Sequence, residues 1–169
     1  CAGNIIYNLA GIGADSIAVG TMGGDSGPYL EWMRNNNINT NYIKIVDKTY
    51  TAQAYITTDN NANQITTFHP GAMQFSHEVK IPHDQSITLG LISPDGRDGM
   101  IEHTKQLIEM NTPYIFDPGQ GMPMFNKDEL NFFTENASWI VMNDYEFKMY
   151  NEITNISSKD ITKKNKTLV

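Results

Sequence analysis

Strand-like and helical segments alternate along most of this chain, and this alternation limits the possible folds more than any other feature. Residues 87–93 form an apolar stretch like those of strands buried on both faces of a parallel sheet. A helical pattern at 100–110 follows. We therefore expect a layered α/β fold, with helices on both faces of a parallel sheet and right-handed crossovers. The later expected segments are strands at 114–116 and 139–142, a helix at 127–135, and a helix beginning near Asn143.

The N-terminal part of the chain predicts similar elements. An apolar pattern at 5–12 predicts a buried helix, and short strands are expected at 15–21 and 42–46. Ser26 is predicted to cap a helix whose first turn holds Pro28, where the missing N–H costs nothing.

One segment departs from this plan. Two extended runs, 51–59 and 64–69, are rich in Thr and contain Ile, Tyr and Phe, which suit a pleated and half-buried surface. The loop at 60–63 is rich in Asn, which tolerates positive φ, so a hairpin is predicted. Pro70-Gly71 should end the second strand abruptly. Because this polar hairpin carries exposed aromatic side chains, we interpret it as a lid over a site.

Composition excludes several classes of protein. The 169 residues are 40% hydrophobic and carry a net charge of −7, which describes a globular chain without a surface for nucleic acid or an anionic membrane. No apolar run approaches the roughly 20 residues that a transmembrane helix needs. The single cysteine, Cys1, cannot form an internal disulfide, so a reducing, cytoplasmic location is expected.

Polar clusters follow the ends of three predicted strands, where ligands bind in parallel sheets. They are 93–95, 117–120 and 143–146. Taken singly, each has helix capping as an equally good explanation, but three at successive strand ends favour a ligand site. The glycines at 20–27 match no phosphate-loop motif. The four histidines lack the spacing of zinc ligands, and surface or capping roles are expected for all of them.

Several motifs, in order, resemble the PfkB (ribokinase-like) carbohydrate and nucleoside kinases. The hairpin with its Pro-Gly-Ala-Met exit and the later polar turns look most like the bacterial adenosine kinase branch. The resemblance implies a ribokinase-like three-layer α/β fold with a small β-hairpin lid, and ATP-dependent phosphorylation of a primary hydroxyl. The motifs that carry it are Ala2-Gly3-Asn4, Asn8-Leu9, Gly13, Val19-Gly20, Gly23, Asp25, Gly27-Pro28-Tyr29, 51–73, Asp117-Pro118 with Gln120, and 143–146.

For the acceptor, the resemblance implies four contact residues. Gly3 and Asn4 match the residues that contact the sugar hydroxyls, Phe68 matches an aromatic that stacks on the base, and Gln120 lines the same pocket. Ala54 stands where that branch can have a second aromatic, and the neighbouring Tyr55 should point to the opposite face of its strand.

For the phosphate donor, the resemblance implies ATP and Mg²⁺. Asn143 and Glu146 match an Asn-x-x-Glu motif that organises water around Mg²⁺ and so positions the phosphates. Glu146 would therefore act on the metal indirectly, through water. The alternative for Glu146 is a charge in the first turn of a helix, favoured there by the helix dipole.

Both ends lead us to expect a fragment of such a kinase. No strand precedes the helix at 5–12, and 166–169 begin a strand. We expect residues 1–169 to form a partial domain with lid strands at about 42–70. No Gly-Ala-Gly-Asp motif, whose aspartate is the family's catalytic base, occurs in the sequence, so the chain alone should be inactive.

Three functions stay open. The first is a kinase acting on a nucleoside, as in adenosine kinases, and the second is a kinase acting on a free sugar, which Ala54 and Gly121 keep open. The third is a non-catalytic fragment for binding or dimerisation. A homodimer could form through the hairpin, because an exposed strand edge invites pairing.

Overall fold

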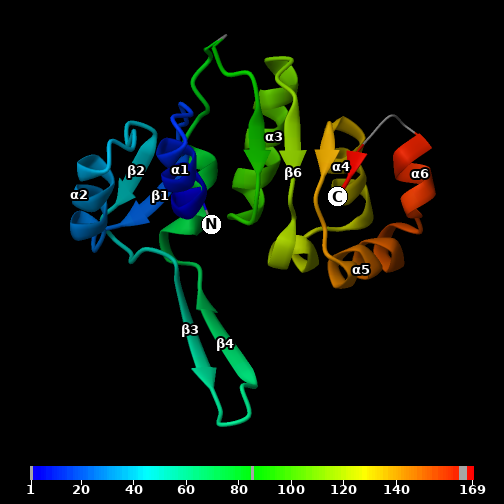
Figure 1. The fold of residues 1–169 in the computed structure, drawn as a ribbon, viewed down its shortest axis with the longest axis horizontal. Coiled ribbons are helices and arrows are strands. Elements are labelled where there is room, and N and C mark those ends of the chain that lie inside the picture. The colour runs from blue at the N-terminus through cyan, green and yellow to red at the C-terminus, as the bar shows by residue number, and fades with distance from the viewer. Residues whose placement is uncertain (1, 85, 164–166) are drawn as a thin grey trace. The chain divides into compact units, whose positions relative to one another are not determined.

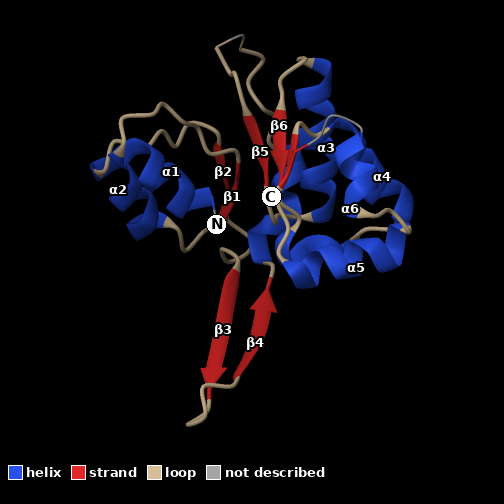
Figure 2. Ribbon diagram, turned by 45° about the vertical axis from the view of Figure 1, so that its right-hand side comes forward, coloured by secondary structure: helices blue, strands red, loops and turns tan. Residues whose placement is uncertain are grey.

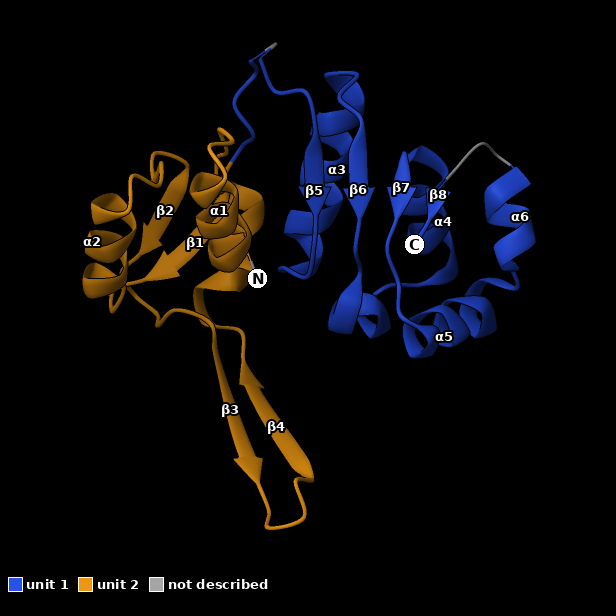
Figure 3. Cartoon of the chain, viewed as in Figure 1, with its two compact units in different colours: residues 1, 80–169 blue, residues 2–79 orange. Residues whose placement is uncertain are grey.

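The computed structural model describes residues 2–84, 86–163 and 167–169, which are traced in Figure 1. The described residues form helices and strands in similar numbers, which agrees with the predicted α/β class. Figure 2 shows the helices in blue and the strands in red. The described residues divide into two compact units, 2–79 and 80–169 (Figure 3). Cys1 and Lys166, which entered the predictions above, lie outside the described residues.

The unit at 2–79 contains a small parallel sheet, two helices and the hairpin. Strand β1 pairs with β2 from Gly20↔Ile43 to Gly23↔Val46. The buried core of this unit consists of Ile6, Ala18, Met33 and Ile38. Its elements are α1 (Ala2–Gly11), β1 (Gly20–Gly23), α2 (Gly27–Asn35), β2 (Ile43–Val46), β3 (Gln53–Thr58), β4 (Gln64–His69) and the 3₁₀ helix η1 (Gly71–Glu78).

Three expectations for this unit were wrong in detail. The strand expected at 15–21 begins only at Gly20, because Ile17 makes just an isolated bridge. In α1 only Ile6 is buried, and Ile12 lies beyond the helix end with 80% of its surface exposed. Ser26 occupies the N-cap position of α2, but it is buried in an αR conformation and its side chain makes no capping hydrogen bond.

The hairpin prediction is confirmed. Strands β3 and β4 pair antiparallel from Gln53↔His69 to Thr58↔Gln64, and in Figure 1 they extend away from β1 and β2. Strand β2, which the expected lid range of 42–70 includes, pairs with β1. At the tip, Asp59 Oδ1 accepts the N–H groups of Asn61 (2.8 Å) and Asn63 (2.9 Å).

The unit at 80–169 contains a four-stranded parallel sheet. Its strands follow one another in the order β5-β6-β7-β8. The longest helix, α3, has 13 residues, and no helix of the described chain is long and apolar enough to cross a membrane. The elements are β5 (Gly90–Ile92), α3 (Arg97–Glu109), β6 (Tyr114–Phe116), the 3₁₀ helix η2 (Gly119–Met124), α4 (Lys127–Asn136), β7 (Trp139–Ile140), α5 (Asp144–Thr154), α6 (Ser158–Lys163) and β8 (Thr167–Leu168).

The helices of this unit share one core with one face of its sheet. Right-handed crossovers between strands that are neighbours in sequence place their helices on the same face. Burial agrees, because Ile92, Phe116 and Ile140 are buried, whereas Leu91 is 40% and Trp139 39% exposed. The other face of the sheet is therefore partly exposed within the described residues.

One histidine also differs from expectation. His103 lies on α3 with only 6% of its surface exposed, so it is a buried helix residue and neither a surface nor a capping group. Its helix packs into the core through Met100 and Leu107, which lie three and four residues away on the same face.

Candidate functional site

The six predicted site residues fall into two groups. Gly3, Asn4 and Phe68 belong to the unit at 2–79. Gln120, Asn143 and Glu146 belong to the unit at 80–169.

Gly3 and Asn4 lie in the first turn of α1. Asn4 is exposed, and its backbone oxygen accepts the side-chain N–H of Asn8 at 2.7 Å. A Cβ atom on Gly3 would clash with the hydroxyl of Tyr29, which lies over this glycine. Gly3 therefore has a packing reason to lack a side chain, in addition to the predicted contact with an acceptor.

Tyr29 belongs to a small exposed aromatic cluster. Its ring stacks on that of Trp32, with centroids 5.7 Å apart, and Trp32 also contacts Tyr7 at 5.2 Å. Each of these three residues is 40–45% exposed. The cluster links α1 to α2 and so holds the helix turn that carries Gly3.

Phe68 lies on the second lid strand and is 52% exposed. The register pairs it with Ala54, so these two side chains share one face of the hairpin. Tyr55 pairs with Thr67 on the opposite face, as the sequence predicted, and cannot replace the missing second aromatic. Ile56 lies on the same face as Phe68, because side chains two residues apart along a strand point the same way.

The three predicted polar clusters lie together at one edge of the larger sheet. Residues 93–95 follow β5, 117–120 follow β6 and 143–146 follow β7, and these parallel strands are neighbours. A Cβ atom on Gly119 would lie 2.7 Å from Pro94 Cγ, so the first two clusters are in contact. Gly119 also has φ of +45°, which disfavours other residues.

Two effects raise the pKa of Asp117. Partial burial raises the pKa of Asp117 above its usual value, and the negative charge of Glu146 raises this pKa further. One hydrogen bond from the Gly119 backbone acts in the opposite direction. Gln120, next along this turn, is exposed. Negative charge therefore accumulates where β6 and β7 end.

Asn143 and Glu146 form a capping box at the start of α5. Asn143 Oδ1 accepts the Glu146 N–H at 2.9 Å, and Glu146 Oε2 accepts the Asn143 N–H at 2.9 Å. This arrangement satisfies two backbone N–H groups that would otherwise lack a partner in the helix. Both side chains thus have a structural role, whatever else they do.

The same Asn-x-x-Glu pattern occurs a second time, at a position for which no such motif was predicted. Asn126 and Glu129 form an equivalent capping box at the start of α4, with both bonds at 3.0 Å. The pattern is itself a sequence signature of a helix start, so it could have been recognised. Glu129 differs from Glu146 in its charged neighbour, because it pairs with Arg97.

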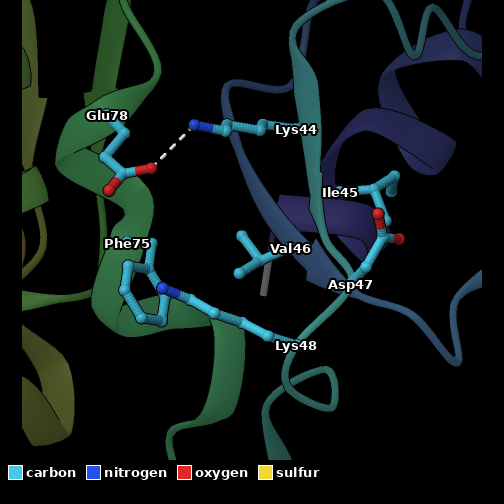
Figure 4. Close-up of a pocket in the computed structure, with 7 residues that line it drawn as sticks. All are labelled: Lys44, Ile45, Val46, Asp47, Lys48, Phe75 and Glu78. Atoms are coloured by element: carbon cyan, nitrogen blue, oxygen red, sulfur yellow. Dashed lines mark hydrogen bonds and ion pairs between the residues drawn. The ribbon is translucent and has the colours of Figure 1, made fainter.

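A shallow groove of about 320 Å³ lies elsewhere, between β2 and η1 (Figure 4). Lys44 bonds Glu78 across it at 2.7 Å, and Lys48 Nζ lies 4.8 Å from the ring centroid of Phe75. It contains none of the predicted site residues. Within the described parts of the chain, no three His, Cys, Asp or Glu side chains gather as metal ligands.

Comparisons with known proteins agree with one another. The sequence profile described as pfkB family carbohydrate kinase matches residues 1–168. A nucleoside kinase of Methanocaldococcus jannaschii is 26% identical over 161 residues, which cover 94% of this chain and 53% of that protein. The structure of Burkholderia thailandensis nucleoside kinase in complex with inosine is 43% identical, with a TM-score of 0.93, and the match covers 99% of this chain and 56% of that one.

The same Burkholderia enzyme has also been solved in complex with ADP-inosine. That structure is 43% identical with a TM-score of 0.91, and the match covers 99% of this chain and 53% of that one. This chain spans about half the length of the curated relatives that it matches.

Proposed function

The chain belongs to the pfkB carbohydrate kinase family, and from that premise we propose that the full-length protein phosphorylates a nucleoside. The reaction is transfer of the γ-phosphoryl group of ATP to the primary hydroxyl, as in adenosine kinases. The observation that carries this proposal is Phe68, an exposed aromatic on one face of the lid hairpin. An exposed ring can stack on a nucleobase, whereas a free sugar has no aromatic face to receive it. The Burkholderia relative in complex with inosine adds support.

The test is a comparison of acceptors. We expect kcat/KM for adenosine or inosine to exceed that for ribose and fructose by at least about tenfold, equivalent to about 1.4 kcal/mol of transition-state binding. The assay uses the full-length protein with ATP and Mg²⁺. A preference for a free sugar by the same factor would reject the proposal.

A free sugar is the second candidate, for a specific reason. Because Ala54 pairs with Phe68, that face of the hairpin offers a single aromatic ring where two could enclose a base. Gly121 is buried in the turn after β6, where a Cβ atom would lie 3.1 Å from Met124 Cε. It therefore cannot supply the second glutamine that can follow Gln120 in adenosine kinases. The acceptor comparison above separates the two candidates.

We propose that Mg²⁺ accompanies ATP and that Glu146 holds it through water. The residues fit such an ion, because two nearby carboxyl groups place negative charge at the ends of β6 and β7. Mg²⁺ usually keeps several waters and binds through only one or two carboxylates. When bound, it neutralises charge on the phosphates. Asn143 keeps Glu146 in place through the capping box.

Glu146→Gln separates this role from capping. Gln keeps an oxygen that can accept the Asn143 N–H, so the melting temperature should change little. We expect the Mg²⁺ concentration for half-maximal rate to rise severalfold. Such a rise corresponds to a loss of about 1 kcal/mol of charge stabilisation. The variant lacks the negative charge beside Asp117, so the pKa of the Asp117 carboxyl should fall. Carbon-13 NMR of the metal-free protein can measure this pKa.

Glu129→Gln is the matched control. It alters the equivalent capping box on α4 and should leave the Mg²⁺ dependence unchanged. If Glu146→Gln also leaves it unchanged, Glu146 is a helix cap and has no role at the metal.

We also propose that two copies associate through the hairpin. A two-stranded sheet has two open edges, and Ile65 is 74% exposed near its tip. Sedimentation of the full-length protein should show a dimer that Ile65→Lys weakens, because an added charge discourages strand pairing. A wild-type monomer at high concentration would contradict this.

We propose a cytoplasmic location as well, since ATP is the donor and Cys1, as the single cysteine, has no partner for an internal disulfide. Cell fractionation with an antibody against the native protein tests this.

A further inference from the structure

We propose that Asp25 is a positioning residue for the acceptor, because its carboxylate ties the lid hairpin to the turn after β1 and so sets the direction in which Phe68 points. This inference rests on the proposed function, in which Phe68 contacts the acceptor. In this proposal Asp25 acts on the acceptor only through Phe68, because its carboxylate is bonded to Thr51 and Gln53.

The carboxylate of Asp25 holds the beginning of the lid. Its Oδ1 accepts both the N–H (2.8 Å) and the hydroxyl (2.7 Å) of Thr51, and its Oδ2 lies 3.4 Å from Gln53 Nε2. The Thr51 hydroxyl oxygen accepts the Gly23 N–H at 3.0 Å. The bonds from Thr51, first that of its backbone N–H, hold the pKa of Asp25 below its usual value, so the carboxylate stays charged.

The end of the hairpin is tied to the same place. The N–H of Ala72 donates to the Tyr50 oxygen at 2.8 Å, and the hydroxyl of Thr21, on β1, donates to the Ala72 oxygen at 2.6 Å. Both chain segments that enter and leave the lid are therefore bound to β1, to its turn and to each other.

Two glycines let these backbones meet without a gap. A Cβ atom on Gly23 would clash with the Tyr50–Thr51 backbone. A Cβ atom on Gly71, which has φ of +48°, would clash with the Tyr50 oxygen. The base of the hairpin is thus a closely packed junction in which a small shift is transmitted along both strands.

Beyond this junction the hairpin has little other support. Residues 54–69 are all exposed, so no core packing sets the direction of the strands. An isolated two-stranded hairpin is marginally stable in water, which makes its anchoring important. Asp25 bonds Thr51 and Gln53, and Gln53 pairs with His69, the residue after Phe68. The position of the Phe68 ring therefore depends on the Asp25 contacts.

A double-mutant cycle in the full-length protein tests this. Asp25→Ala should raise KM for adenosine by about tenfold and leave KM for ATP within about twofold, because only the acceptor contact is displaced. In a Phe68→Ala background the same change should have an effect below about twofold, since the group it positions is gone. Asp25→Asn should restore most of the affinity, because its amide oxygen can still accept from Thr51.

Asp59→Ala is the matched control. Asp59 is also an exposed carboxylate bonded to backbone N–H groups, but it lies at the hairpin tip, and its loss should leave KM for adenosine unchanged. If Asp25→Ala does not fold, Thr51→Val replaces it in the cycle, because it removes the hydroxyl donor and keeps the N–H.

The outcomes separate the inference from the proposed function. If Phe68→Ala alone leaves KM for adenosine unchanged, the proposed acceptor contact is wrong and the inference fails with it. If Phe68→Ala raises KM for adenosine, but Asp25→Ala raises it by the same factor with and without Phe68, Asp25 does not act through Phe68. A fall in melting temperature with unchanged KM would likewise reduce Asp25 to a structural residue.

Discussion

Phe133→Ala should lower the free energy of unfolding by about 3–5 kcal/mol, the usual cost of removing a buried phenylalanine. Phe133 on α4 is fully buried. Its ring stacks on Phe116 with centroids 4.7 Å apart and meets the edge of Phe125 at 4.9 Å. Urea unfolding of the full-length protein, followed by circular dichroism, measures the loss. The cavity left behind would be lined by aromatic rings from β6 and from the loop before α4, which cannot collapse into it easily.

The neighbouring Phe132 provides a control. It is only partly buried and lies at the margin of the same core, 5.6 Å from Phe133. Phe132→Ala should therefore cost less than half as much as Phe133→Ala. Equal losses would mean that the core is not centred on the Phe116–Phe133 stack. Tyr114, whose hydroxyl donates to the Phe133 backbone oxygen at 2.6 Å, should keep its bond in both variants.

Phe68→Ala should weaken nucleoside binding by about 1–3 kcal/mol, the range for stacking of a base on an aromatic side chain. That corresponds to a KM for adenosine raised by about 5- to 150-fold. Phe68 is 52% exposed on the lid, so its removal should cost little stability. The KM for ATP should stay unchanged, and any residual activity on ribose should be unaffected, because ribose has no base to stack.

Tyr55→Ala is the control for this effect. Tyr55 is an aromatic residue on the same hairpin, 60% exposed, but it lies on the face opposite Phe68. Its replacement should leave KM for adenosine within about twofold, because its ring points away from the acceptor. If the two variants behave alike, the hairpin acts through its general surface rather than through Phe68. Phe68→Trp should preserve binding, since a larger ring can still stack.

Features that depend on neighbouring residues could be read from the sequence. The hairpin followed from β-branched and aromatic runs around an Asn-rich loop, and its second strand ends at His69, directly before Pro70-Gly71. One detail of the loop was not predicted: its residue at positive φ is Ala62 and not an asparagine. The alternation of strands and helices predicted that strands β5 to β8 are parallel, since a parallel connection usually crosses over through a helix.

The polar clusters at the ends of the strands were also predictable from the sequence. Because parallel strands end at the same edge, residues 93–95, 117–120 and 143–146 were expected together, and Gly119 indeed lies against Pro94. The boundaries were less certain, as the strand expected at 15–21 begins only at Gly20. Strand propensity alone does not decide where a ladder of hydrogen bonds begins, because the partner strand must be present.

The sequence by itself therefore determined the family, the α/β class, the hairpin and the polar groups at the strand ends, since each depends on short-range patterns. The tertiary structure alone decided which groups meet. It placed Ala54 opposite Phe68, buried His103, and brought the Glu146 charge close enough to raise the pKa of Asp117. It also joined Asp25 to Thr51, 26 residues further along the chain. Contacts of this kind depend on strand register and on the packing of distant segments, which no local propensity encodes.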